Sequence, residues 1–111
     1  MKVQKHTRDL SEQDCLDITL MWETRGILTK FALNYRAFID GKWYEVYRVD
    51  NYHGFLHEQR YWRSLKPISI TDKEGWALKM VFDTYVDEIV SNFQRYRVYY
   101  EKALRNNKTS R

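Results

Sequence analysis

The carboxyl-terminal third of the chain limits how the protein can fold more than any other segment. From Trp76 to Arg111 the sequence has neither glycine nor proline, the residues that most often interrupt helices. Apolar and aromatic side chains recur there at steps of three or four, which places them on one stripe of a helix. They are Leu78, Phe82, Tyr85, Ile89, Phe93, Tyr96 and Tyr100. The spacing predicts an amphipathic helix of about 30 residues, ~45 Å long.

Two local signals describe the ends of this helix. Thr71 and Glu74 in "TDKE" match a capping box, in which both side chains bond free amides at the start of a helix. From Phe93 to Arg111 six Lys or Arg residues stand against the single acid Glu101, a local balance of +5. Such a basic end suits nucleic-acid phosphates or an acidic partner protein, and it equally suits the negative end of the helix dipole. We predict a helix over residues 72–105 with a basic tail.

The middle of the chain predicts strands. In "ILTKFALNYRAFI", residues 27–39, every second residue from Phe31 onward is apolar, while Lys30, Asn34 and Arg36 fall on the other side. Asp40-Gly41 is a strong hairpin signal, and "KWYEVYRVD" follows as a second strand. "NYHG" turns the chain again, and "FLHEQRYW" returns as a third strand antiparallel to the second.

The register of the first hairpin decides which face carries its charged residues. A two-residue loop pairs Leu33 with Arg48 and sets both Arg48 and Asp50 among apolar neighbours. A three-residue loop, with Gly41 in a left-handed bulge, pairs Leu33 with Tyr47 and leaves the two charges on the open face. We prefer the bulged register because it buries apolar side chains without burying charges.

Together these elements predict an α+β fold. The first 24 residues are weakly patterned, although Ser11 could cap a short helix carrying Leu16 and Leu20. Residues 27–62 form a small antiparallel β-meander of about three strands, packed against the one long carboxyl-terminal helix. With 111 residues, the chain is expected to form a single domain over residues 1–111.

Composition narrows the classes of function. Apolar residues make up 43% of the chain, which indicates a globular protein rather than a disordered one. No run of apolar residues is long enough for a membrane span or a secretory signal, so we expect a cytoplasmic protein without membrane contact. Cys15 stands alone, which excludes an internal disulfide and a zinc site of paired cysteines. Because no phosphate loop or nucleotide fingerprint is present, no cofactor is predicted.

The densest group of reactive residue types lies in "VYRVDNYHGFLHEQRYW", residues 46–62. His53 and His57 flank a glycine turn, where one imidazole can accept a proton while the other donates one. This pair of groups suits cleavage of RNA by attack of the RNA's own 2′-hydroxyl. Arg48 would stabilise the charge that develops on phosphate, and Asp50 would orient a ring. We therefore predict His53, His57, Arg48 and Asp50 as catalytic residues that need no metal.

Two other interpretations of this segment stay open. Asp50, His53 and His57 could together hold a metal ion, but no signature with metal-ligand spacing supports this, and no metal site is predicted. In the structural alternative, Asp50 or Asn51 caps backbone amides, Arg48 pairs across strands and the histidines are partly exposed.

The stretch "YRVDNYHGFLH", residues 47–57, resembles the short signature of small prokaryotic proteins that include TumE-type toxins of toxin–antitoxin pairs. A related uncharacterised small-protein family is equally compatible with it. The matching positions are Arg48, Asp50, Asn51, His53 and His57. The resemblance implies a ribonuclease-like protein sequestered by an antitoxin. The chain departs from the toxin pattern after His57, where "EQRYW" replaces a denser histidine cluster, and this departure bears on catalysis more than on RNA binding.

Aromatic and basic residues suggest a second class of function. Tyrosines and Trp62 interleave with arginines along the second and third predicted strands, as in sheets that stack bases and hold phosphates. The predicted nucleic-acid contacts are Arg60, Arg63, Arg95, Arg97 and Arg105. A third class is a protein that assembles through its long helix, as a homodimer or with an antitoxin-like partner. We rank an RNA-directed ribonuclease first, an RNA-binding module without catalysis second, and an assembly protein third.

Overall fold

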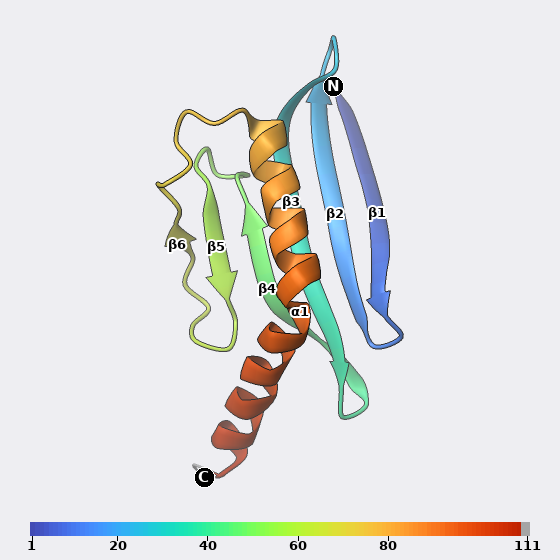
Figure 1. Cartoon of the computed structure of the whole chain (residues 1–111), viewed down its shortest axis with the longest axis vertical. Helices are drawn as coiled ribbons and strands as arrows, with labels where there is room; N and C mark the ends of the chain where they lie inside the picture. Colours follow the sequence, from blue (N-terminus) through green and yellow to red (C-terminus); the bar gives the residue numbers. More distant parts are fainter. Residues whose placement is uncertain (110–111) are drawn as a thin grey trace.

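The computed structural model describes the backbone of residues 1–109 and the side chains of residues 1–107. Its elements are β1 (Lys2–Ser11), β2 (Asp14–Glu23), β3 (Ile27–Ile39), β4 (Lys42–Asp50), β5 (His57–Arg60), β6 (Ile68–Ser69) and α1 (Leu78–Thr109). The strands form one sheet in sequence order, and every neighbouring pair is antiparallel (Figure 1). The predicted α+β meander with one long helix is confirmed, but the described residues form six strands rather than three. In the predicted basic tail, the side chains of Lys108 and Arg111 lie outside the described residues.

The first correction concerns the amino-terminal segment, which forms the β1–β2 hairpin instead of a short helix. Leu16 and Leu20 lie four residues apart, a spacing that fits one face of a helix and also one face of a strand. Ile18 between them is buried as well, which shows that the period is two. Ser11 caps no helix; its hydroxyl accepts from the amide of Gln13 and donates to Asp14 at 2.6 Å within the turn.

The second correction concerns the start of the helix. Gly75 adopts a φ of +83°, a left-handed conformation that a right-handed helix cannot contain. Thr71 and Glu74 therefore belong to a turn, in which the amide of Glu74 donates to the carbonyl of Thr71 at 3.4 Å. The helix begins at Leu78 instead of residue 72 and runs to Thr109.

The third correction concerns the β3–β4 register. Asp40 and Gly41 have φ values of 50° and 88°, so they form a two-residue loop that pairs Ile39 with Lys42. A bulge in β4 after residue 45 then shifts the pairing, and Leu33 lies opposite Val49. Neither predicted pairing occurs. The observed register differs from the preferred one by two residues, an even shift, so the residues predicted to face away from the core still do so.

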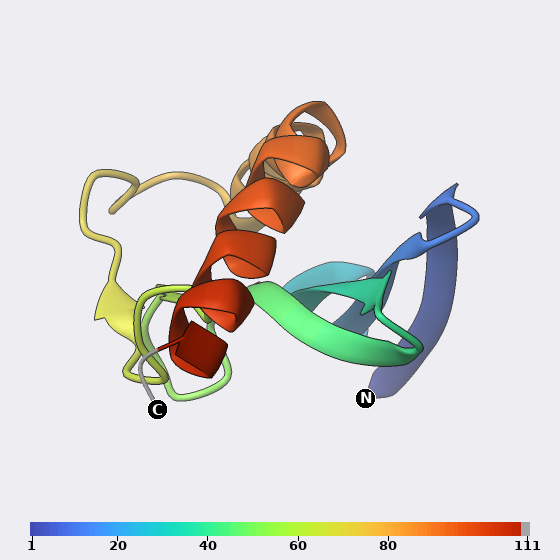
Figure 2. The same cartoon turned by 90° about the horizontal axis from the view of Figure 1, so that it is seen from below.

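The helix packs on one face of the sheet, and no helix of the described chain covers the opposite face (Figure 2). Phe31 meets Phe82 with ring centroids 5.6 Å apart, and Tyr35 meets Phe93 at 5.9 Å, so the contacts of α1 concentrate on the central strands. The last turns of α1 project past the end of the sheet (Figure 1). Within residues 1–109, no helix is both long enough and apolar enough to cross a lipid bilayer.

Candidate functional site

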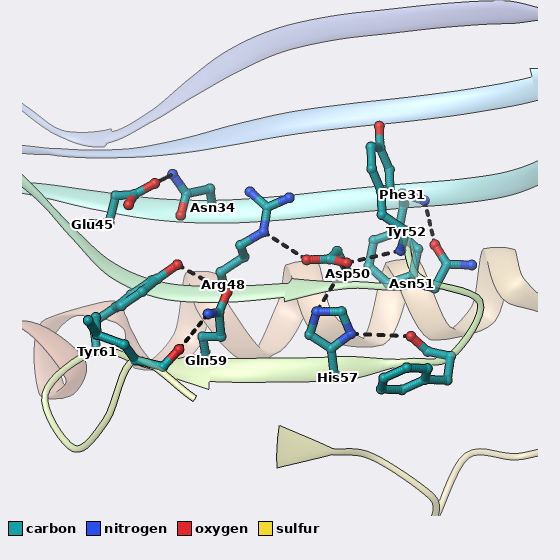
Figure 3. Close-up of polar contacts among 12 residues, drawn as sticks. Phe31, Asn34, Glu45, Arg48, Asp50, Asn51, Tyr52, His57, Gln59 and Tyr61 are labelled. Carbon is teal, nitrogen blue, oxygen red and sulfur yellow. Dashed lines mark hydrogen bonds and ion pairs between the residues drawn. The ribbon is translucent and has the colours of Figure 1, made fainter. Parts of the chain in front are cut away.

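Asp50 is the centre of a polar network on the face of the sheet opposite the helix. Its side chain is almost fully buried, at 3% exposure. One carboxylate oxygen accepts from Nε of Arg48 at 2.7 Å, and the other accepts from the amide of Tyr52 at 3.0 Å. Nε2 of His57 lies 3.3 Å from that second oxygen (Figure 3). The register places these groups together, because Asp50 pairs with His57 across β4 and β5.

His57 is held on both sides. Nε2 faces Asp50, and Nδ1 lies 3.3 Å from the carbonyl oxygen of Phe55, so both ring nitrogens face acceptors (Figure 3). A neutral imidazole has one N–H, and only a doubly protonated ring donates to both oxygens. The residue is also buried, at 4% exposure. In this arrangement both ring nitrogens point at protein oxygens and the ring is buried, so His57 cannot reach a substrate proton without moving.

His53 lies beside His57 but in a different environment. The two rings stack with centroids 5.7 Å apart and an angle of 23° between their planes, and His53 is exposed. Arg48 is also partly exposed, and none of the described residues bonds its two terminal amino groups. The structure thus brings the four predicted catalytic residues together, and it leaves only His53 and the end of Arg48 within reach of solvent.

The metal interpretation has no geometric support in the described part of the chain. Among residues 1–109, no three His, Cys, Asp or Glu side chains are arranged to hold a metal ion.

The guanidinium of Arg97, one of the predicted nucleic-acid contacts, is bonded to other parts of the fold. Its guanidinium donates to the carbonyls of Gln13 and Phe38, at 3.2 and 2.7 Å, and to Asp14 at 3.1 Å. The hydroxyl of Tyr35 donates to the same oxygen of Asp14 at 2.5 Å, and burial followed by this hydrogen bond raises the pKa of Tyr35. Arg97 therefore fastens α1 to the β1–β2 turn and to β3.

The other two helical arginines differ from Arg97. Arg95 is exposed and donates only to Asn92, at 2.7 Å, on its own helix. Arg105 lines a small hollow of about 270 Å³ together with the acidic side chains of Asp40 and Glu101. Neither arrangement forms a basic surface.

Arg60 and Arg63 meet the carboxyl-terminal half of α1 in a shallow groove of about 410 Å³. Lys102 is the third cation of this groove, and the rings of Trp62 and Tyr99 form its aromatic part, with centroids 5.5 Å apart. The lining is completed by Ala103 and Asn106, so none of the described residues that line the groove is a carboxylate. We call this surface the Trp62 groove.

A second hollow of about 480 Å³ adjoins the Trp62 groove and shares Trp62 and Arg63 with it. Its lining has no carboxylate either, as far as the side chains are described. The two hollows form one track along the β5–β6 connection and the end of α1.

The groove is held in shape from below. Trp62 stacks on Tyr96 with centroids 5.3 Å apart and lies 6.3 Å from Tyr47. Glu58 accepts from the hydroxyl of Tyr47 at 2.5 Å and from Nε of Arg60 at 2.8 Å. Burial, followed by the bond to Glu58, raises the pKa of Tyr47. These contacts fix Trp62 and one of the three cations before any ligand arrives.

Sequence analysis missed Tyr99 and Lys102. Tyr99 lies outside the buried stripe of the helix and is 40% exposed, with Lys102 one turn further on the same side. The signal available in the sequence was an aromatic residue that lies off the apolar stripe and three residues before a lysine.

The sequence profile of one protein family, described as a domain of unknown function (DUF7718), matches residues 1–106. The chain belongs to the DUF7718 family. No curated protein and no solved structure matches it.

The DUF7718 match spans the whole sheet and α1 as far as Asn106. Both the Asp50 network and the Trp62 groove lie inside it. The last lining residue of the groove, Asn106, is also the last matched residue.

Proposed function

We propose that this DUF7718 protein binds single-stranded RNA in the Trp62 groove without cleaving it. One observation carries the proposal: three cations and two aromatic rings share a groove whose described lining, within residues 1–107, contains no carboxylate. Exposed rings stack unpaired bases, and cations beside them hold the phosphates.

The state of the cations supports this assignment. Among the described residues Arg63 and Lys102 take part in no ion pair, whereas Arg36, Arg48 and Arg97 are each paired with an aspartate. A cation without a partner in the fold can neutralise a phosphate without first giving up a bond. Binding should therefore weaken steeply as salt concentration rises.

RNA cleavage of the TumE type is the second candidate. The observation in its favour is that Arg48, Asp50, His53 and His57 form one cluster, as the resemblance implies. Acid–base catalysis would require His57 to release Asp50 or Phe55 and to become accessible, because both of its nitrogens are engaged. We therefore place binding before cleavage, the reverse of the order that the sequence suggested.

The test measures the affinity of the purified chain for fluorescently labelled single-stranded RNA by anisotropy at two salt concentrations. Arg63→Glu with Lys102→Glu should weaken binding at least about tenfold, because two phosphate contacts become repulsive. Tyr99→Ala should cost about 1–3 kcal/mol of binding free energy through lost stacking. Arg25→Glu with Lys79→Glu makes the same change in net charge at exposed positions outside the groove, and it should retain affinity.

Equal losses of RNA affinity in the two double variants would contradict binding in the Trp62 groove, because binding would then depend on net charge alone. Absence of RNA binding would end the proposal. Incubation of RNA in EDTA distinguishes the second candidate: cleavage abolished by His53→Ala would establish catalysis, and intact RNA is the expected result.

A further inference from the structure

The strand β1 is the free edge of the sheet on the side far from the helix (Figures 1 and 2). All of its residues except Leu10 are exposed, and its packing contacts are to β2. Both faces and the outer edge of β1 therefore meet solvent along ten residues.

This edge is regular enough to accept another strand. Pairing with β2 is uninterrupted from Lys2 to Asp9, and the first register shift comes only between Asp9 and Ser11. The strand contains no proline. Proteins protect a free edge with a bulge, a proline, a short strand or charged side chains, above all lysine. Between Lys2 and Asp9, β1 has none of the first three, and its cations Lys2, Lys5 and Arg8 repel a basic strand but not an acidic one. Its outward amides and carbonyls are a template for strand addition.

Charge on β1 specifies the kind of strand that would fit. Register places Lys2, His6 and Arg8 on the face that continues the core, opposite Trp22, Ile18 and Leu16. No carboxylate of β1 lies on that face, because its one acid, Asp9, is on the other side, paired with Cys15. An added strand with carboxylates at alternate positions would meet these cations directly.

The same charges disfavour a second copy of β1. Two such strands side by side would bring three Lys or Arg residues from each chain together, against one aspartate from each. β1 also has no Phe, Tyr or Trp on which an RNA base could stack, and the imidazole of His6 is its one aromatic ring; this separates β1 from the Trp62 groove.

We propose that β1 binds an extended acidic segment of a partner protein as a seventh strand of the sheet. The ladder of backbone hydrogen bonds supplies the attachment, and Lys2 and Arg8 select the acidic sequence.

The test uses the full chain and a labelled eight-residue peptide in which glutamate and threonine alternate. Binding is followed by fluorescence anisotropy, and we expect Lys2→Glu with Arg8→Glu to weaken it at least about tenfold. The matched control, Arg63→Glu with Lys102→Glu, should bind the peptide as the unaltered chain does. Both substituted positions on β1 are exposed, so thermal unfolding should be unchanged.

A second peptide separates strand addition from simple charge attraction. With every backbone nitrogen methylated, the peptide keeps its carboxylates but loses its amide donors, and it should not bind. Equal binding of the methylated peptide, or no binding of either peptide, would overturn the proposal. So would a dimer in sedimentation experiments that Lys2→Glu with Arg8→Glu dissociates, since the edge would then serve a second copy. RNA binding lost in that same variant would assign the edge to RNA instead.

Discussion

The Asp50 network and the Trp62 groove contain the same kinds of residue, arginines beside aromatic rings, yet they differ in what their charges contact. In the network, Asp50 is bonded to Arg48, His57 and the amide of Tyr52, and the carboxylate is almost fully buried. In the groove, Arg63 and Lys102 have no ion pair among the described residues. Charges that the fold has paired stabilise it, and charges that it leaves unpaired are available to a ligand.

This difference reverses the expectation from residue types. His53 and His57 drew attention because imidazoles can transfer protons, but a ring with both nitrogens engaged mainly positions its neighbours. Arg60 and Arg63 carry no special reactivity. Arg60 is held by Glu58, whereas Arg63, in the groove beside the end of α1, has no ion pair among the described residues and is the one of the two left available to a ligand.

The largest effect is expected from Asp50→Ala, which tests whether the network is structural. Removing the carboxylate leaves His57 buried and deprives Arg48 and the Tyr52 amide of their acceptor. Breaking a buried charge pair in this way should lower the free energy of unfolding by about 3 kcal/mol, measured by urea denaturation.

Asp83→Ala is the matched control for Asp50→Ala. Lys79 and Asp83 are also 2.7 Å apart, but both are more than half exposed, and their loss should cost less than about 0.5 kcal/mol. If Asp50→Ala and Asp83→Ala lower the free energy of unfolding by the same amount, burial does not explain the stabilising effect of the Asp50 network. If Asp50→Ala spares stability and abolishes an RNA-dependent activity, the network is a functional site.

A smaller effect is expected from Arg97→Ala, which separates two arginines that the sequence grouped together. Arg97 fastens the helix to Gln13, Asp14 and Phe38, so its loss should lower the free energy of unfolding by about 2 kcal/mol. RNA affinity of the folded variant should be unchanged. Arg95→Ala should alter stability by less than about 0.5 kcal/mol, because Arg95 is exposed and its side-chain hydrogen bond among the described residues goes to Asn92 on its own helix. A loss of RNA affinity in Arg97→Ala without a loss of stability would place Arg97 on the binding surface.

Local patterns predicted the elements that depend on near neighbours. The helix followed from a stripe repeated over seven positions, and the open-face placement of Arg48 and Asp50 followed from the period of two. The β1–β2 hairpin could not be predicted from Leu16 and Leu20 alone, because their spacing fits a helix as well as a strand. The start of the helix was misplaced because a matching capping box does not reveal that Gly75 takes a left-handed conformation.

The partners of the charged residues depend on contacts that no local pattern contains. Apart from Glu101, whose carboxylate lies 3.8 Å from Nε one turn along the helix, the acceptors of Arg97 are 59 to 84 residues away in the sequence, where no local pattern could reveal them. The bulge in β4 likewise set the pairs across the hairpin. The Trp62 groove required the β5–β6 connection to meet the end of α1, and only Arg60 and Arg63 of its cations were predicted as contacts.

The smallest effect concerns Asp17 and Arg36, a pair intermediate between the network and the groove. The two side chains lie on the open face, and each is about one-third exposed, at 33% and 32%. Burial alone would raise the pKa of Asp17, but hydrogen bonds from Arg36 and Thr7 outweigh it and the pKa is lowered. A carboxyl group with a lowered pKa stabilises the folded chain above its unfolded value of about 4, and this stabilisation is lost as the pH falls through the folded value.

Arg36→Ala should therefore reduce the free energy of unfolding near neutral pH by less than about 1 kcal/mol, because solvent screens a pair this exposed. The difference from the unaltered chain should shrink as the pH falls below the unfolded value of about 4 and through the lower folded value, because Asp17 then becomes protonated in both states. Lys2→Ala, at an exposed position, is the control and should give a difference that does not vary over this range. A loss as large as that of Asp50→Ala would show that partial exposure does not weaken paired charges on this face. Whether a charge stabilises the fold or is available to a ligand would then depend only on whether it is paired, and not on how far it is buried.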